Sequence, residues 1–183
     1  MPASTSFRDG LLAAVPTLRA FAVSLAKNSD RADDLVQETL VKAWDKQGSF
    51  QPGTNLKAWL FTILRNEFYS QMRKRRREVE DSDGSIIARL SVHPSQDGSS
   101  DLSDFRRALA LLPEDQREAI ILIGASGFSY EEAAEICGCA VGTIKSRVSR
   151  ARTRLQQILA IEGEGDFGPD AISSQVTNSA VVA

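Results

Sequence analysis

The chain has 183 residues, 42% of them hydrophobic and 25% charged, with a formal net charge of -2, and this size suits one ordinary domain or two small ones. Its two cysteines, Cys137 and Cys139, are too few and too close for a disulfide framework, and the lone His93 has no visible nucleophile or ligand set beside it, which argues against an enzyme, a metal centre or a cofactor site. No apolar run approaches the roughly 18 residues of a membrane span and no signal peptide precedes the first predicted helix, so the sequence predicts a soluble, cytoplasmic protein without a membrane span.

The small net charge hides a strong segregation of charge along the chain. Residues 51–77 hold seven basic residues against one acid, residues 78–104 hold seven acids against one arginine, and residues 141–155 hold five basic residues and no acid. Two basic blocks separated by an acidic one predict two surfaces for a polyanion, with a repelled segment between them.

Two helices are predicted before residue 47. The first runs from Gly10 to about Asn28, with a break or kink expected near Pro16, because proline lacks the amide hydrogen that a helix interior uses. The second runs from Arg31 to Lys46 and has one apolar side. On this side we expect the following residues to face inward: Ala32, Leu35, Val36, Leu40, Ala43 and Trp44.

The outer side of the second helix is acidic. Its polar residues are Asp33, Asp34, Gln37 and Glu38. Acidic side chains near a helix N-terminus are favoured by the helix dipole, so a solvated surface is one interpretation. The other interpretation is a docking face for a basic partner.

A loop over residues 48–55, rich in glycine and polar residues, leads into a third long helix over about residues 56–77. The main apolar stripe of this helix contains Trp59, an adjacent face contains Phe61 and Arg65, and the helix ends in five consecutive basic residues. A tryptophan at core spacing usually belongs to the core. Aromatic side chains beside arginines, however, also suit stacking on unpaired bases and binding the backbone of a single nucleic-acid strand.

Residues 78–101 are a linker by composition, since acids, serines and glycines dominate and only a short stretch at 86–90 is apolar. A linker of this composition cannot by itself fix the distance between the parts that it joins. Four helices are predicted after it. Residues 161–183 are predicted to be a disordered tail, because glycines, acids and polar residues follow one another there without a period.

A helix-turn-helix pattern lies between residues 127 and 155. Ser129 followed by Glu132 is a capping box that predicts the start of a short helix, and Gly138 supplies the turn, because glycine tolerates the left-handed conformation that ends a helix. The following helix has one stripe of apolar residues that we expect to be buried: Val141, Ile144, Val148, Ala151 and Leu155.

The opposite side of that last helix is basic and carries small hydroxyl side chains. A basic amphipathic helix alone is usually only a solvated face, but here it follows a capped helix and a glycine turn, which is the pattern of DNA-binding helix-turn-helix units. Basic and hydroxyl side chains contact phosphates and base edges. The candidate DNA-binding residues of this helix are Thr143, Lys145, Ser146, Arg147, Ser149, Arg150 and Arg154.

Three segments together resemble the bacterial extracytoplasmic-function (ECF) sigma factors, in the order and spacing of that family. The resemblance to region 2.1–2.2 lies in DRADDLVQETLVKAW, that to region 2.3–2.4 in NLKAWLFTILRNEFYSQMRKRRR, and that to region 4 in LPEDQREAIILIGASGFSYEEAAEICGCAVGTIKSRVSRARTRL. The sequences of these segments also resemble the EcfG-type subgroup of the general stress response. The resemblance implies an all-α fold of two small helical domains: a region 2 bundle of three to four helices over residues 10–77 and a four-helix region 4 domain over residues 102–160, joined by the flexible acidic linker at 78–101.

The resemblance also implies roles for features already found. It assigns the acidic face to docking on core RNA polymerase, the loop at 49–55 to capture of a flipped base of the −10 element, and the helix at 142–154 to the −35 element. The candidate DNA-binding residues of the first domain, which include the basic end of its third helix, are Ser49, Phe50, Asn55, Trp59, Phe61, Arg65, Asn66, Arg73, Arg75 and Arg76.

These features predict a promoter-specificity subunit, not an enzyme, that brings core RNA polymerase to promoter DNA and helps to open the −10 region in a general stress response. The resemblance implies a small NepR-type anti-sigma protein as a further partner. One alternative is an ordinary helix-turn-helix regulator, against which the aromatic and basic helix at 56–77 argues. Another is a sigma-like decoy that binds an anti-sigma factor; such decoys carry a phosphoreceiver domain, for which this chain has no room.

Overall fold

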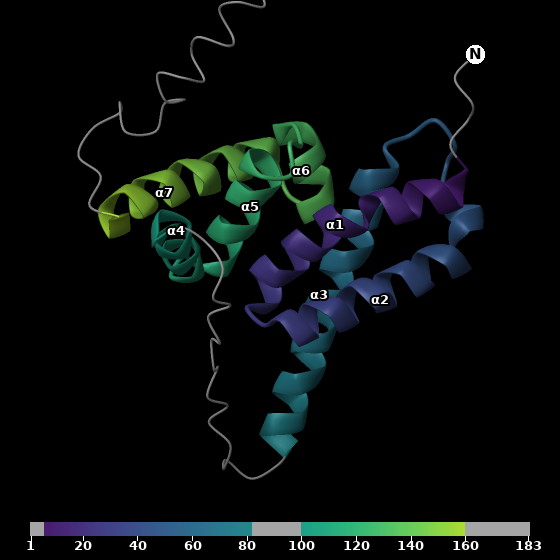
Figure 1. Ribbon diagram of the computed structural model, residues 1–183, viewed down its shortest axis with the longest axis horizontal. Coiled ribbons are helices and arrows are strands. Elements are labelled where there is room, and N and C mark those ends of the chain that lie inside the picture. Colours follow the sequence, from purple (N-terminus) through teal and green to yellow (C-terminus); the bar gives the residue numbers. More distant parts are fainter. Residues whose placement is uncertain (1–5, 82–99, 160–183) are drawn as a thin grey trace, which may run out of the picture.

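The computed structural model describes residues 6–81 and 100–159, and in these residues the chain is all α-helical (Figure 1). Seven α-helices and one short 3-10 turn form two small domains there, which confirms the predicted fold class. The predicted tail at 161–183 and most of the predicted linker at 78–101 lie outside the described residues.

The first domain consists of three helices and a short turn. The first helix is capped by Ser6, whose hydroxyl accepts from the Asp9 amide at 3.2 Å, and the second by Asn28, whose side chain accepts from the Arg31 amide at 2.9 Å. The third helix continues beyond its predicted end at residue 77. The elements are α1 (Phe7–Ala26), α2 (Ser29–Asp45), η1 (Gln47–Ser49) and α3 (Leu56–Asp81).

Helix α1 is continuous through Pro16, so of the predicted break or kink the break is wrong. Proline removes the hydrogen bond to the carbonyl four residues earlier, that of Leu12, and its ring crowds the same carbonyl. Both residues are exposed, so water can solvate the free carbonyl. By length and composition alone, α1 is apolar enough to cross a membrane, which corrects our expectation that no apolar run approaches a membrane span. The core helix of a soluble protein passes the same test, and six residues of α1 are buried in the core.

The second domain consists of four helices. The predicted capping box is confirmed, because the Ser129 hydroxyl accepts from the Glu132 amide and the Glu132 carboxylate accepts from the Ser129 amide. Gly138 ends the short helix in the left-handed conformation at φ 62°, as predicted. The last helix buries four of the five residues predicted for its apolar stripe, Ile144, Val148, Ala151 and Leu155, while Val141 is half-buried. The elements are α4 (Ser100–Ala110), α5 (Glu114–Gly124), α6 (Tyr130–Cys137) and α7 (Val141–Leu159).

The two domains pack directly against each other, which the sequence did not reveal. Helix α1 lies against α5 and α3 lies against α6, so that α5 and α6 stand between α7 and the first domain (Figure 1). One continuous cluster of buried apolar residues includes Phe21 and Phe61 of the first domain and Phe128 of the second. A polar contact extends the interface, since the Lys27 ammonium donates to the carbonyl of Ala110 at 2.8 Å.

Inside the first domain, Glu67 of α3 is a buried carboxylate held by two donors. It forms an ion pair with Lys42 of α2 and accepts from the side-chain amide of Gln71 at 3.1 Å. Burial by itself would raise the pKa of Glu67, but the hydrogen bonds from Lys42 and Gln71 outweigh it and hold that pKa below its usual 4.5. The carboxylate therefore ties α3 to α2 in its ionised form.

We expect Glu67→Gln to lower the free energy of unfolding at pH 7 by about 1–3 kcal/mol, because the Lys42 ammonium loses its buried charged acceptor and keeps only Glu38, at 3.4 Å. A depressed folded-state pKa gives stability that is present above the unfolded pKa and is lost as the pH falls through the folded pKa. Urea denaturation should therefore show the difference between variant and parent shrinking below about pH 4.5. The exposed Asp45→Asn is the control, and a difference that does not change with pH would contradict the pairing.

Candidate nucleic-acid interface

The acidic residues predicted for the outer side of α2 do not all remain free. Asp33 accepts from the Arg19 guanidinium at 2.6 Å, and this hydrogen bond lowers the pKa of Asp33. Glu38 accepts from Gln71 at 3.0 Å and lies 3.4 Å from the Lys42 ammonium. Of these four residues, only Asp34 and Gln37 are exposed and have no polar partner among the described residues.

An exposed apolar surface lies next to Asp34 and Gln37 along α2. Val41 is 55% exposed and Trp44 is 49% exposed, so the prediction that Trp44 faces inward is wrong. The reason is that Ala43, fully buried, takes the core position of that turn. Asp34, Gln37, Val41 and Trp44 follow one another at steps of three and four and so share one helix face. We call these four residues the α2 stripe.

The predicted −10 loop is anchored by aromatic contacts. The ring of Phe50 lies 5.4 Å from that of Trp59 and 5.8 Å from that of Phe7, measured between centroids. Trp59 is therefore half-buried against the loop and the start of α1, while Ser49 beside it stays exposed. The loop enters α3 through Asn55, whose side-chain oxygen caps the helix by accepting from the Ala58 amide at 3.1 Å.

A second face of α3 is covered by the second domain. Lys57, Phe61, Arg65 and Tyr69 recur every four residues and all point at α5, α6 or the segment between them; we call them the covered face. Phe61 is fully buried, stacked on Phe21 at 4.8 Å and edge-on to Phe128 at 4.9 Å between centroids. In this conformation Phe61 is a core residue and is not accessible to DNA.

Arg65 is bound to the second domain through a buried carboxylate. Its Nε donates to Glu118 of α5 at 2.6 Å, and the Tyr69 hydroxyl donates to the other oxygen of the same carboxylate at 3.4 Å. The Glu118 side chain is 1% exposed and that of Arg65 is 19% exposed. Burial alone would lower the pKa of Arg65, but the hydrogen bond and charge of Glu118 outweigh burial and raise that pKa.

Two further residues at the start of α3, Lys57 of the covered face and the capping residue Asn55, join the first domain to the second. The Lys57 ammonium donates to the Ser126 carbonyl at 2.6 Å and lies 5.0 Å from the centre of the Phe128 ring. The side-chain amide of Asn55 donates to Glu132 at 2.6 Å. Sequence reasoning missed the partners of these residues, because the spacing of the covered face indicates a second contact surface but not which helix meets it.

The other candidate DNA-binding residues at the outer side and basic end of α3 are accessible to solvent. Asn66 and the basic residues Arg73, Arg75 and Arg76 are exposed. The structure therefore divides the predicted −10 residues into an accessible set on the loop and on the outer side of α3, and a set, Asn55, Phe61 and Arg65, that contacts the second domain.

On α7 most of the predicted DNA-binding residues lie on the accessible side. Lys145, Ser149, Arg150 and Arg154 are exposed, while Thr143 and Ser146 are half-buried. Arg147 is the exception. Its Nε lies 3.2 Å from Asp115 of α5 and its Nη1 lies 3.9 Å from the Cys139 sulfur, so this side chain also holds α7 to its neighbours.

We expect Arg150→Ala to reduce affinity for a −35 duplex by about 1–3 kcal/mol without changing stability, because its side chain is exposed and makes no contact within the described residues. Val148→Ala should do the opposite: it is 1% exposed, and its truncation should cost about 1–3 kcal/mol of folding stability. Arg147→Ala should affect both. Fluorescence anisotropy with a labelled duplex measures DNA affinity, and urea denaturation measures stability, so the two together distinguish the three variants. Equal DNA affinity of Arg150→Ala and the parent would show that Arg150 does not contact DNA.

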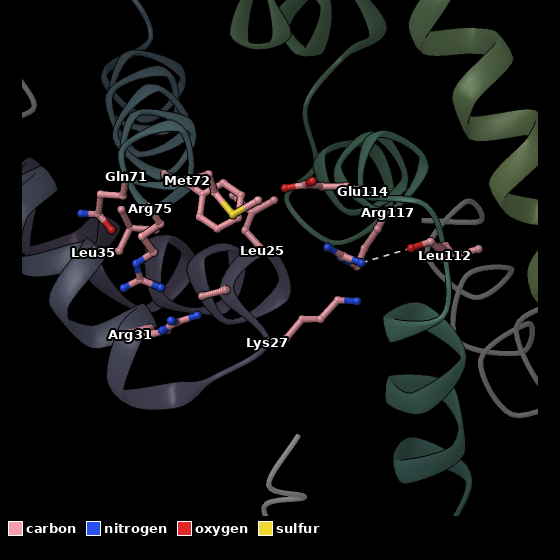
Figure 2. A pocket seen from close by; sticks show the side chains of 12 residues that line it. Leu25, Lys27, Arg31, Leu35, Gln71, Met72, Arg75, Leu112, Glu114 and Arg117 are labelled. Atoms are coloured by element: carbon pink, nitrogen blue, oxygen red, sulfur yellow. Dashed lines mark hydrogen bonds between the residues drawn. The ribbon is translucent and has the colours of Figure 1, made fainter. Parts of the chain in front are cut away.

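A pocket of about 220 Å³ opens between α1, α2, α3 and α5, on the same boundary between the domains (Figure 2). Apolar residues such as Leu25 and Met72 line one side, and Lys27 and Arg117 extend toward each other across the other. Arg117 is 4% exposed and donates to the Leu112 carbonyl at 3.1 Å. The pocket marks the less closely packed end of the domain contact.

The cysteines belong to the packing of the helix-turn-helix. Burial raises the pKa of Cys137 to about 12, so its thiol is unreactive at neutral pH. Within residues 6–81 and 100–159, no group of three or more His, Cys, Asp and Glu side chains is placed to hold a metal ion.

Comparisons with known proteins match both domains. The family described as Sigma-70 region 2 matches residues 12–78, and that described as Sigma-70, region 4 matches residues 102–155. The chain is 65% identical over 170 residues to the ECF RNA polymerase sigma factor EcfG of Rhodopseudomonas palustris, covering 93% of this chain and 94% of the relative. It is 38% identical over 125 residues to the ECF sigma factor SigC of Mycobacterium tuberculosis, covering 68% of each.

Among solved structures, the chain is similar to the sigma factor RpoE of Bartonella quintana in its complex with the anti-sigma factor NepR. The sequences are 67% identical, the TM-score is 0.78, and the match covers 87% of this chain and 100% of the other. A second likeness, at 20% identity and a TM-score of 0.64, is to a PhyR–NepR complex from Sphingomonas and shows the fold alone.

Proposed function

The chain belongs to the ECF branch of the sigma-70 family, and on that premise we propose that it directs core RNA polymerase to promoters through a −10 and a −35 element. The observation that supports this most is the pairing of two different nucleic-acid surfaces in one chain. One is the basic, exposed side of α7, whose apolar side is buried, and the other is the loop and basic end of α3.

The two surfaces suit different forms of DNA. A helix-turn-helix presents its second helix to the major groove of a duplex, and the exposed Lys145, Ser149 and Arg150 lie along such a helix. The loop with Ser49 and Phe50, and the aromatic and basic side chains of α3, suit bases that have left the stack. Binding such bases contributes about 1–3 kcal/mol each and favours the melted −10 region by mass action, without covalent chemistry from this chain.

Docking on the polymerase is assigned to the α2 stripe. It combines polar, partner-free Asp34 and Gln37 with the exposed apolar side chains of Val41 and Trp44, a composition that suits the core and rim of a protein interface. The proposal includes a cytoplasmic, non-enzymatic initiation factor. It also includes a role in the general stress response, which the EcfG name of the similar protein of R. palustris supports. The proposed domains are region 2 at residues 10–77 and region 4 at residues 102–160, and the matched regions at 12–78 and 102–155 support these limits.

Run-off transcription tests the proposal directly. Purified core polymerase is incubated with genomic fragments of the source bacterium, with and without the chain, and the 5′ ends of the transcripts are mapped. We expect new start sites that share two elements at a constant spacing. If the chain binds DNA but adds no start site to those of core polymerase alone, it is a helix-turn-helix regulator instead.

A NepR-type anti-sigma protein is the second proposed partner, since the B. quintana relative was solved in complex with NepR. We expect such a protein to compete with core polymerase, so that adding it before polymerase abolishes run-off transcription and adding it afterwards has a smaller effect. Size-exclusion chromatography of the three components checks this. Stable co-elution of all three would contradict competition.

A further inference from the structure

The pocket between α1, α2, α3 and α5 combines an apolar wall with an excess of positive charge (Figure 2). Half of its lining residues are apolar, namely Leu25, Ala26, Leu35, Phe68, Met72 and Leu112. The remaining ones include four cations, Lys27, Arg31, Arg75 and Arg117, and a single acid, Glu114. Because the chain as a whole has a net charge of -2, this excess of positive charge is a local property of the pocket.

The two cations that extend toward each other across the pocket, Lys27 and Arg117, form no ion pair within the part of the chain that the structure describes. Arg117 is 4% exposed; its Nη1 donates to the Leu112 carbonyl, but its Nε has no hydrogen-bond partner among the described residues. Lys27 donates to a neutral group, the Ala110 carbonyl. Burial lowers the pKa of both side chains, and the charge of Arg117 lowers that of Lys27 further. A buried charge without a counter-ion is costly, so an anion in the pocket would be stabilising.

Glu114 offsets only part of this charge. It lies near enough to Lys27 and Arg117 to raise the pKa of each, yet it forms an ion pair with neither among the described residues, and its buried Oε1 has no hydrogen-bond partner there. Buried polar groups in folded proteins nearly always have a partner. An unpaired donor and an unpaired acceptor on the lining of one pocket are therefore the features of a ligand site.

We propose that this pocket binds a small organic phosphate, with the phosphate among the basic side chains and an apolar or aromatic body against Phe68 and Met72. Guanidinium groups match phosphate oxygens in geometry. Four cations less one carboxylate leave a surplus of three positive charges, which suits a dianionic phosphate better than a singly charged carboxylate. The volume of about 220 Å³ is below the roughly 300–1,000 Å³ of drug-sized sites, so the ligand is about as large as one phosphorylated ring.

The ligand would contact both domains. Lys27, Arg31 and Arg75 belong to the first domain, and Leu112 and Arg117 belong to the second. A ligand that binds a site formed by both domains stabilises their packing by mass action. This goes beyond the proposed function, because neither DNA nor polymerase is needed for the binding, and it gives the chain a site for a small-molecule signal.

Phenyl phosphate is the probe, because it joins one aromatic ring to a phosphate that is a dianion at about pH 7.5. It is titrated into the full chain labelled with nitrogen-15, and proton–nitrogen correlation spectra follow the amides of Lys27 and Met72 and the side-chain Nε–H of Arg117. We expect these signals to shift together and to saturate with a Kd of about 1 mM or below. Inorganic phosphate, which lacks the ring, and benzoate, which has one charge, should each bind at least about fivefold more weakly.

Two variants should have opposite effects on this affinity. Arg31→Gln removes an exposed cation of the pocket and should weaken binding of phenyl phosphate about fivefold. Glu114→Gln removes the only acid of the lining and should tighten it about threefold. The matched controls are Arg152→Gln and Glu135→Gln, which remove the same charges from exposed positions of α7 and α6 outside the pocket and should bind as the parent does.

Three results would overturn the proposal. Shifts confined to the basic side of α7 would show general attraction of anions to the surface. Equal affinities for inorganic and phenyl phosphate would show that the apolar wall holds no ligand body. Equal affinities of Arg31→Gln and Arg152→Gln would place the phosphate outside the pocket. Should circular dichroism show that Glu114→Gln does not fold, Arg31→Gln decides alone, because its side chain is exposed and makes no polar contact among the described residues.

Discussion

Replacing both Asp34 and Gln37 with lysine should abolish the association of this chain with core RNA polymerase while leaving its helices intact. Both side chains are exposed and have no polar partner within the described residues, so their replacement disturbs no internal contact. Like charges that face each other across an interface cost several kcal/mol of binding free energy, which is enough to abolish a stable complex. Glu38 is left unchanged, because its contacts with Gln71 and Lys42 would confuse a docking defect with a packing defect.

Asp45→Lys is the matched control, since it places a lysine at an exposed position of the same helix, beyond the α2 stripe. Trp44→Ala adds an apolar test: a tryptophan at the centre of an interface typically loses about 2 kcal/mol or more on truncation. Pull-down with core polymerase and the helical signal in circular dichroism measure the two properties. Undiminished association of the lysine double variant would reduce the acidic face to a solvated surface.

The sequence predicted the elements well wherever a local signal was strong. The capping box at Ser129 and Glu132, the left-handed Gly138 and the apolar stripe of α7 all depend on residues within a few positions of one another. The first two are confirmed, and the stripe is buried except at Val141, which is half-buried. The break predicted at Pro16 was wrong, since α1 continues through it. Leu12, whose carbonyl Pro16 leaves without its helix partner, is exposed to water, and the local pattern does not show this.

The contacts between the domains could not be predicted in the same way. Arg65 and Glu118 are 53 residues apart, and Asn55 and Glu132 are 77 apart. Nothing in the spacing of either segment identifies the other as its partner. The covered face was visible as a second stripe on α3, but aromatic and basic side chains there suit a nucleic-acid strand and a neighbouring domain equally well. Trp44 was predicted to be buried and is exposed, because helical spacing does not distinguish a residue at the edge of a core from one at its centre.

Phe61→Ala should cause the largest loss of stability of any single change proposed for this chain, about 3–5 kcal/mol in the free energy of unfolding. Its ring is fully buried and contacts an aromatic ring on each side, Phe21 in its own domain and Phe128 in the other. Small domains are stable by only about 5–15 kcal/mol, so the variant should be partly unfolded near physiological temperature. Trp59→Ala, at a half-buried position, should cost less stability but more −10 binding.

Phe61→Leu separates packing from DNA contact, because it keeps an apolar side chain of similar volume and should cost only about 1–1.5 kcal/mol. A leucine cannot stack on an unpaired base as a ring does. If Phe61 serves the core alone, Phe61→Leu should melt promoters as well as the parent does, and Phe61→Ala should lose stability and transcription together. If Phe61 reaches DNA when the domains separate, Phe61→Leu should remain folded in urea denaturation and still lose open-complex formation. The second result would show that one ring serves two surfaces in turn, packed on Phe128 in the free chain and on a base in the holoenzyme.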